Sequence, residues 1–211
     1  MISLLIDTSV NRLIIGVYKN NKQLYIYNDC SDNDLSRKVL PKINEILSSL
    51  SINVNQIDNI YIVNGPGSFT GIRIGTTIAK TWAYSLGKKI YSISELKLMA
   101  TSNTDKKYIV PMIDARRGYV YAGMYDSNLN STINDKYVEK QVLLDEIKRN
   151  YSLEDVFFVS YDNLDNCNFP NINVEKILSL SNLKESNPHN INPNYLKKTE
   201  AEERLNDKKN N

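Results

Sequence analysis

Four of the eight glycines of the chain lie within eleven residues, in the stretch 65-GPGSFTGIRIG-75. A glycine-rich loop between a strand and a helix is a common phosphate-binding site, because free backbone amides at the start of the helix point at the anion. Ser68 and Thr70 would add hydroxyl groups at the same position. These residues therefore first suggest a phosphate-binding site.

The spacing of the glycines does not fit either of the two common phosphate loops. A Walker loop needs Lys and then Ser or Thr directly after its last glycine, whereas Ile72 follows Gly71 and the next lysine is Lys80. The dinucleotide fingerprint needs two residues between its second and third glycines, and three residues separate Gly67 from Gly71. Binding of an anion at the start of the helix stays open as the lesser alternative.

Asp7 and Asp114 each end an apolar run of the kind that forms a strand. In actin-like kinases an aspartate at the end of the first strand faces phosphate and magnesium. The other interpretation of Asp7, which we favour, is that it stabilises a tight turn by accepting a hydrogen bond from the backbone two residues on. A metal site shared by Asp7 and Asp114 requires the two strand ends to converge.

The remaining candidates for catalysis are few. His189 is the single histidine, so neither a Ser-His-Asp hydrolase nor a histidine-based metal site is expected. Arg116 and Arg117 lie in a predicted turn, where paired arginines usually form a solvated tip. Cys30 and Cys167 stand far apart without further ligands, which excludes a zinc ribbon and favours a reducing, cytoplasmic compartment. We expect no catalytic residues and no metal site.

The composition sets further limits on function. The chain has 211 residues, 41% of them hydrophobic and 24% charged, as in an ordinary globular protein. A formal net charge of +2 gives no general attraction to nucleic acid or to a membrane surface. The start, 1-MISLLID-7, lacks the features of a secretory signal, and no apolar run approaches the roughly 20 residues of a membrane helix. We expect no membrane association.

Runs of β-branched and aromatic residues, turn signals and helical periodicity predict the elements that must position these side chains. In chain order they are strands at 2–7, 12–18 and 22–28, a helix at 35–50, a strand at 58–63, a helix at about 70–86 ending at Gly87, a strand at 89–92, a helix at 95–102, paired strands at 108–114 and 119–125, a strand near 136–140, a helix at 142–150, a strand at 155–160, a helix near 175–184 and a frayed polar end at 200–211. We find no internal sequence repeat.

Three antiparallel strands followed by strands that alternate with helices is the order of an α/β, actin-like (ribonuclease-H-like) fold. We expect two small subdomains, residues 1–100 and 101–211, each with a mixed sheet and flanking helices, the second one reduced. Two prolines bear on this assignment. Pro41 must kink its helix or mark the first turn, and Pro111 indicates an edge strand or a bulge.

The helix at 70–86 carries two parallel strips of apolar residues. The small strip consists of Gly71, Gly75, Ala79 and Ala83, and the large strip consists of Ile74, Ile78, Trp82 and Leu86. Together they cover more of the circumference than the ~100° that one core contact requires. A glycine inside a helix also costs up to ~1 kcal/mol relative to alanine, so two of them need a packing reason. Both strips could pack inside the chain, but we favour one strip on the sheet and the other on a partner protein.

Several segments, in the right order and spacing, resemble the TsaB family of bacterial tRNA threonylcarbamoyladenosine biosynthesis proteins. They are 5-LIDTS-9, 65-GPGSFTGIRIG-75, 113-IDARRGYVY-121 and 193-PNYLKK-198. The glycine segment is the most specific, and the resemblance is strong over residues 1–125, lapses afterwards and returns near the C-terminus. It implies an actin-like fold and a role in forming N6-threonylcarbamoyladenosine at position 37 of tRNA.

In that family the transfer reaction belongs to the paralogue TsaD. The resemblance therefore implies a non-catalytic cytoplasmic subunit that forms a heterodimer with TsaD, with the ATPase TsaE completing the complex and tRNA contacted only indirectly. ATP and magnesium are used by the complex, and we expect no tightly bound cofactor here. Self-association without TsaD stays open. The implied docking residues, on helices 35–50 and 71–86, are Leu35, Val39, Ile43, Gly71, Ile74, Gly75, Ile78, Ala79, Trp82 and Ala83.

The chain departs from the family pattern at two positions. Leu35 stands where many members have histidine, and Tyr119 stands where glutamate is common. The histidine pair that binds metal in TsaD has no counterpart. The competing function is a free-standing actin-like phosphotransferase that binds ATP with Asp7, Ser68 and Thr70. Residues 126–211 contain no glycine for a second nucleotide motif, and a peptidase would need a triad or a histidine pair.

Overall fold

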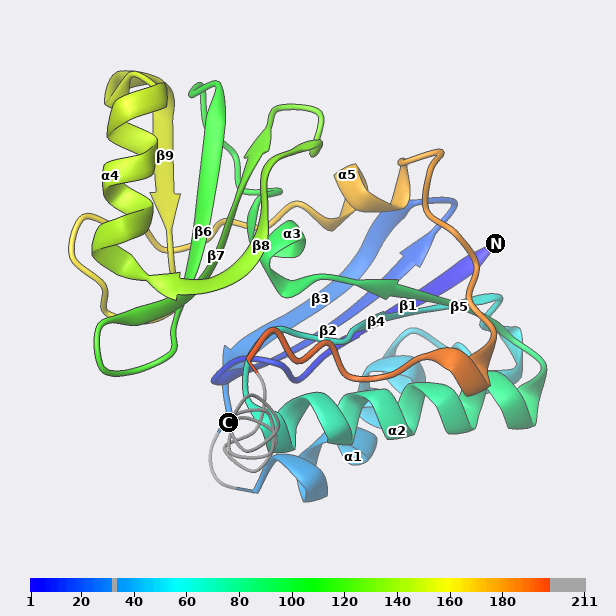
Figure 1. Ribbon diagram of the computed structural model, residues 1–211. Helices are drawn as coiled ribbons and strands as arrows, with labels where there is room; N and C mark the ends of the chain where they lie inside the picture. Colours follow the sequence, from blue (N-terminus) through cyan, green and yellow to red (C-terminus); the bar gives the residue numbers. More distant parts are fainter. Residues whose placement is uncertain (32–33, 198–211) are drawn as a thin grey trace.

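The computed structural model describes residues 1–31 and 34–197, and two mixed β-sheets with flanking helices form its framework (Figure 1). The first sheet has the strand order β3-β2-β1-β4-β5. Its strands are β1 (Ile2–Asp7), β2 (Arg12–Lys19), β3 (Lys22–Cys30), β4 (Asn59–Val63) and β5 (Lys89–Ile93). β2 runs antiparallel to both β1 and β3, whereas β4 pairs in parallel with β1 on one side and with β5 on the other. All five lie close to their predicted positions.

Two helices, α1 (Leu35–Ser49) and α2 (Phe69–Leu86), cover one face of this sheet (Figure 1). They enclose a core of aliphatic side chains from the sheet and from the inner sides of both helices. Local chemistry sets the ends of α2: the Ser68 hydroxyl accepts a hydrogen bond from the Gly71 N–H at 3.3 Å, and Gly87 ends the helix with φ of 60°. Pro41 lies inside α1, so the alternative that it marks the first turn is wrong.

The second sheet has the order β8-β7-β6-β9 and is covered on one face by a single long helix, α4. Its elements are β6 (Tyr108–Asp114), β7 (Tyr119–Asp126), β8 (Ser131–Glu139), α4 (Lys140–Asn150), the short 3-10 turn η2 (Leu153–Asp155) and β9 (Val156–Val159). Three antiparallel strands, a helix and a parallel strand therefore occur here as they do in β1, β2, β3, α1 and β4. The expected fold class is confirmed, and the two lobes repeat one topology without a repeat in the sequence.

Pro111 lies on an internal strand, because β6 pairs with β7 on one side and with β9 on the other. The expectation of an edge strand or a bulge is therefore wrong. The pairing with β7 lapses at Val110 and Pro111 and resumes in the same register, while the pairing with β9 continues through both residues. The sheet accommodates the missing N–H of proline by this local gap in one ladder.

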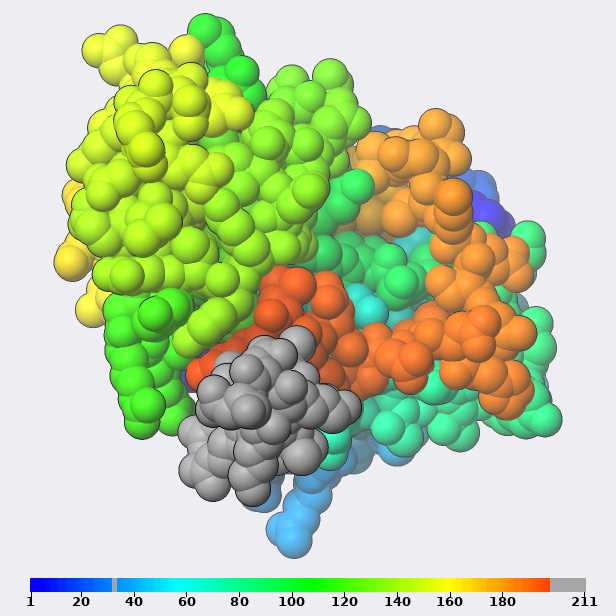
Figure 2. Space-filling view, viewed as in Figure 1, coloured from blue at the N-terminus to red at the C-terminus, as the bar shows by residue number. Residues whose placement is uncertain are grey.

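After β9 the chain returns to the first lobe. The helix α5 (Val174–Leu178) and the 3-10 turn η3 (Pro188–Asn190) lie on this return path, and the backbone of Ser186 pairs with that of Ile90 on β5. Further on, the Asn194 N–H donates to the Asn64 carbonyl at 2.7 Å. Figure 2 shows this last segment lying in the seam between the two lobes. Residues 174–197 therefore contact both lobes, since Ser186 pairs with β5 of the first lobe and the Lys197 ammonium lies 5.1 Å from the Tyr137 ring centroid on β8 of the second.

Two predicted helices are shorter in the structure. The helix α3 (Glu95–Met99) ends early because the Thr101 and Ser102 hydroxyls bond back to carbonyls of its last turn. Similarly, α5 ends at Leu178, and the next residue, Ser179, bonds back to the Glu175 carbonyl. The predicted polar end at 200–211 lies outside the described residues.

Within the described residues, no helix combines the length and the apolar character needed to cross a bilayer.

Candidate docking face and glycine loop

The small strip of α2 faces the interior of this chain. A Cβ atom on Gly71 would overlap the carbonyl oxygen of Thr8, and one on Gly75 would overlap the Thr8 Oγ1 atom. The Thr8 hydroxyl also donates to the Gly71 carbonyl at 2.7 Å, which joins the end of β1 to the first turn of α2. The two glycines therefore allow a helix to approach a strand end more closely than alanine would permit.

This packing corrects part of the predicted docking set. The residues that are buried in the chain's own core are Val39, Ile43, Gly71, Gly75, Ala79 and Ala83. These residues pack inside the chain, against the first sheet and within its core, so they form no surface for a partner. The two-strip pattern did not indicate which strip faces inward, because that depends on how close the helix comes to the sheet.

The large strip has a different environment. Ile74, Ile78 and Trp82 on α2, and Leu35 at the start of α1, are only partly buried and pack at the margin of the same core. We call these four residues the docking face. One side of each is supported by the core and the other side is open, which is the arrangement expected of a preformed contact surface rather than of a complete core.

A cavity of about 540 Å³ lies where the first turns of α1 and α2 meet. It is lined by Val10, Asn11, Ser31, Leu35, Ser36, Ser68, Thr70, Gly71, Ile74 and Arg116. We call it the loop cavity. Two of the predicted phosphate ligands, Ser68 and Thr70, lie in its wall, and Arg116 joins them from the turn between β6 and β7. The loop cavity thus contains residues of both lobes.

Asp7, the third predicted phosphate ligand, does not line the loop cavity. Its side chain is completely buried, and its Oδ1 atom accepts hydrogen bonds from the Ser9 N–H and the Ser9 hydroxyl, both at 2.7 Å. Burial raises the pKa of this carboxyl, and the two bonds from Ser9 partly oppose the shift. The turn interpretation of Asp7 is therefore confirmed.

Asp114 serves a turn of its own, in which its carboxylate accepts a hydrogen bond from the Arg116 N–H at 2.9 Å. Among residues 1–31 and 34–197, no three His, Cys, Asp or Glu side chains are grouped so as to hold a metal ion.

A cluster that the sequence interpretation missed fixes the C-terminal segment to the start of α2. The rings of Phe69 and Tyr195 stack with centroids 4.9 Å apart. The guanidinium of Arg73 lies 3.8 Å from the Phe69 ring centroid, and its Nε–H donates to the Tyr195 hydroxyl at 2.9 Å. The segment 193-PNYLKK-198 was noticed only for its resemblance, since nothing in its composition indicates that Tyr195 meets a helix so far away in the chain.

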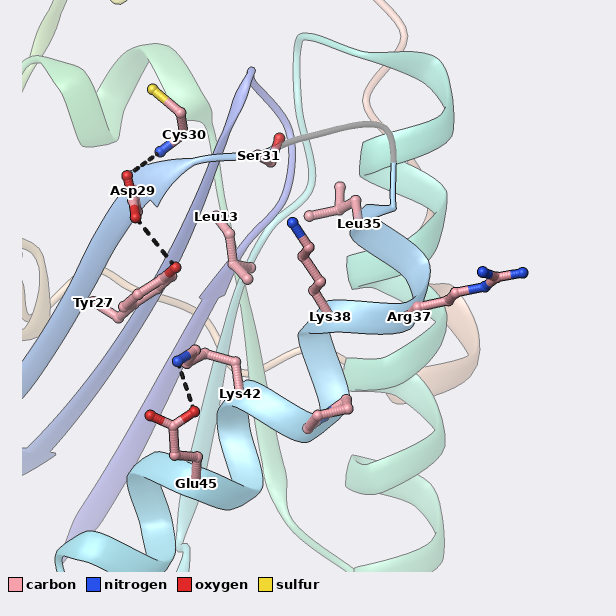
Figure 3. A pocket seen from close by; sticks show the side chains of 11 residues that line it. Leu13, Tyr27, Asp29, Cys30, Ser31, Leu35, Arg37, Lys38, Lys42 and Glu45 are labelled. Atoms are coloured by element: carbon pink, nitrogen blue, oxygen red, sulfur yellow. Dashed lines mark hydrogen bonds and ion pairs between the residues drawn. The ribbon is translucent and has the colours of Figure 1, made fainter.

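A second cavity, of about 550 Å³, lies on the other flank of α1, between this helix and strands β2 and β3 (Figure 3). Its wall includes an ion pair between Lys42 and Glu45 with an N–O distance of 2.6 Å, and the Lys42 ammonium lies 5.0 Å from the Tyr27 ring centroid. The Glu45 carboxylate raises the pKa of Lys42. The wall of this cavity is therefore mixed, with Leu13, Leu35 and Pro41 beside the charged Lys42 and Glu45.

Both a family model and individual relatives with similar sequences match this chain. Residues 30–154 match the model of the family described as "TsaD: tRNA N6-adenosine threonylcarbamoyltransferase". The chain is 32% identical over 145 residues to "tRNA threonylcarbamoyladenosine biosynthesis protein TsaB" of Bacillus subtilis, a match that covers 68% of this chain and 63% of that protein. The protein of the same name from Buchnera aphidicola (Schizaphis graminum) is 31% identical over 150 residues, 70% of this chain and 71% of its own length.

A solved structure from Pseudomonas aeruginosa, described as similar to the peptidase YeaZ, superimposes with a TM-score of 0.76. The superposition covers 93% of this chain and 99% of that one at 18% sequence identity. At this identity the likeness supports the two-lobed fold and carries no argument about activity.

Proposed function

The chain belongs to the TsaB family, and on that premise we propose that it acts in tRNA threonylcarbamoyladenosine biosynthesis as a non-catalytic subunit. Its task is to bind and activate the TsaD-type transferase, and a TsaE-type ATPase completes the complex. The observation that carries this proposal is the docking face, an apolar surface on α2 and the start of α1 that the chain's own core leaves half open.

The chemistry of the docking face suits a protein partner. Trp82 and two isoleucines form an apolar strip beside the polar loop cavity, and buried tryptophans are among the residues that contribute most to interface energies. A stable interface buries about 1,200 Å² or more in total. The partner must therefore also cover surface beyond the four residues of the docking face.

Binding can be tested by isothermal titration calorimetry of the purified chain with the cognate TsaD protein. In the variant Ile78→Glu a carboxylate replaces an apolar contact, and burying it without a partner is costly. We expect affinity to fall at least tenfold, equivalent to about 1.4 kcal/mol. The matched control is Thr77→Glu, which adds the same charge on the same helix at an exposed position outside the docking face.

Thr77→Glu should unfold at nearly the wild-type urea concentration because Thr77 is exposed, whereas Ile78→Glu loses some stability because Ile78 packs on the margin of the core. Binding is therefore compared under conditions where urea unfolding shows both variants to be folded. The proposal of TsaD binding fails if the wild-type chain forms no complex. The assignment of the docking face fails if Ile78→Glu binds as tightly as Thr77→Glu. Self-association of the chain through the same face would appear as a change of oligomeric state that Ile78→Glu abolishes in the absence of TsaD.

A further inference from the structure

Two carboxyl side chains meet in the interior at the junction of the lobes, and neither was paired with the other in the sequence interpretation. Asp7 ends β1 and Glu95 begins α3, and both are 0% exposed. The Ser9 hydroxyl lies between them, with its oxygen 2.7 Å from Asp7 Oδ1 and 3.1 Å from Glu95 Oε2. Within the described residues, neither carboxyl forms an ion pair with a lysine or an arginine.

The two hydrogen bonds between the Ser9 hydroxyl and the carboxyls of Asp7 and Glu95 need two protons, and the Ser9 hydroxyl supplies only one. A hydroxyl has one proton to donate, and an ionised carboxylate can only accept. If Ser9 donates to Asp7, its oxygen and Glu95 Oε2 form a hydrogen bond only when Glu95 carries a proton. If Ser9 donates to Glu95 instead, Asp7 must carry one. Asp7 Oδ1 also accepts from the Ser9 backbone N–H, which favours an ionised Asp7 and a neutral Glu95.

The outer oxygens of the pair strengthen this assignment. Asp7 Oδ2 and Glu95 Oε1 are buried and have no hydrogen-bond partner among the described residues. Two ionised carboxylates so placed would repel each other, and no lysine or arginine of the described residues forms an ion pair with either of them. Burial raises the pKa of Glu95 well above its ordinary value, and the charge of Asp7 raises it further.

The groups around the pair do not neutralise it. Tyr161, which follows β9 in the second lobe, has a buried hydroxyl that forms no hydrogen bond with the residues that the structure describes. Its pKa is raised mainly by burial and further by the charges of Glu95 and Asp7. The Arg12 guanidinium from β2 stacks on aromatic rings instead, 5.5 Å from the Tyr161 centroid and 5.2 Å from that of Phe169. A shared proton is therefore the means by which the pair is stabilised.

The pair lies where three parts of the fold are joined. The Glu95 N–H donates to the Gly65 carbonyl at 2.9 Å, and the Ser68 N–H donates to the Ser9 carbonyl at 2.6 Å. The end of β1, the glycine loop and the start of α3 are therefore held together around the two carboxyls. We propose that Asp7 and Glu95 share one proton at neutral pH, and that its loss at higher pH loosens this junction.

The direction of the pH effect follows from linkage. Unfolded Glu95 ionises near pH 4.5, its ordinary value, whereas folded Glu95 keeps its proton to higher pH. The stabilising effect is fully present below the pKa of unfolded Glu95 and is lost as pH rises toward the pKa of folded Glu95. Over this range the folding equilibrium constant falls by up to tenfold per pH unit. Asp7 contributes in the same direction, and the variants below separate the two.

The experiment compares urea unfolding of the full chain from pH 5 to pH 9 for the wild type, Glu95→Gln and the control Glu154→Gln. Glutamine keeps a donor group at position 95 without a titrating proton, while Glu154 is exposed. We expect the wild type and Glu154→Gln to lose stability with rising pH relative to Glu95→Gln, by up to tenfold per unit. Parallel pH dependences of all three proteins would overturn the proposal.

Carbon-13 NMR of the side-chain carboxyls gives a readout that does not depend on whether Glu95→Gln folds. One glutamate resonance of the folded wild type should stay in its protonated position above pH 6, and it should shift to a lower titration midpoint in Asp7→Asn, which removes the neighbouring charge. If all glutamate resonances and the Asp7 resonance of the folded wild type titrate below pH 5, the shared proton does not exist.

Discussion

Adding one methyl group at Gly75 tests whether the small strip of α2 faces the strand end or a partner. In an exposed helix Gly→Ala stabilises by up to about 1 kcal/mol. Here the new Cβ would overlap Thr8 Oγ1 and lie 3.1 Å from Ile62 Cδ1. Overpacking of this kind costs about 1–3 kcal/mol. The hydrogen bond from Thr8 to the Gly71 carbonyl, worth about 1 kcal/mol, would also be disturbed.

The balance predicts that Gly75→Ala destabilises the chain by about 1–3 kcal/mol, because two losses exceed the gain in helix propensity. Urea unfolding followed by the fluorescence of Trp82, the single tryptophan, measures this. A matched control is Ser85→Ala, an exposed position on the same helix, where only the small difference in helix propensity should appear.

A second substitution identifies the atom responsible. In a Thr8→Ala background the obstructing Oγ1 atom is absent, so Gly75→Ala should cost at least 1 kcal/mol less than in the wild type, a coupling typical of residues in contact. Gly71→Ala should stay destabilising in that background, because its Cβ meets the backbone carbonyl oxygen of residue 8. The reasoning is refuted if Gly75→Ala stabilises the wild-type chain, or if its cost is the same with and without Thr8.

Two further predictions concern the C-terminal segment and the loop cavity. Replacing Tyr195 by Ala removes the stack on Phe69 and the hydrogen bond from Arg73. The packing of the C-terminal segment on α2 should therefore lose about 1–2 kcal/mol, and limited proteolysis should cleave this segment faster. An unchanged cleavage rate would contradict the prediction. Calorimetry of the chain alone with millimolar ATP and magnesium should give no heat of binding, because Asp7 is buried in its own turn. Tight binding that Arg116→Ala weakens would instead support the phosphotransferase alternative.

Most of the first lobe was predictable because its signals are local. Turn residues separate the first three strands, the Ser68 hydroxyl and Gly87 set the ends of α2, and apolar periodicity identifies α1. Each of these features acts within a few residues of the chain. The prediction for Pro111 failed because distant strands decide its environment, and the sheet accommodates it by a gap in one ladder. The length of α3 was also wrong, although the Thr101 and Ser102 hydroxyls that end this helix act locally.

The candidate site was predictable only in part. The glycine loop leads into α2 with the Ser68 hydroxyl as its cap, whereas the role of α2 in docking stays a prediction. Of the ten predicted docking residues, six are in the core. The Phe69–Arg73–Tyr195 cluster was not found, because its members are joined only when the C-terminal segment returns to the first lobe.

Residue types and their spacing were enough to indicate the family, the order of strands and helices, and the two apolar strips on one helix. Which strip is internal, and the meeting of Asp7 with Glu95, depend on contacts between segments far apart in the chain. Periodicity reports which side chains share a face of a helix, but the partner of that face depends on how closely two distant backbones approach. At Gly71 and Gly75 that approach leaves no room for a Cβ atom, and the small strip is internal for this reason.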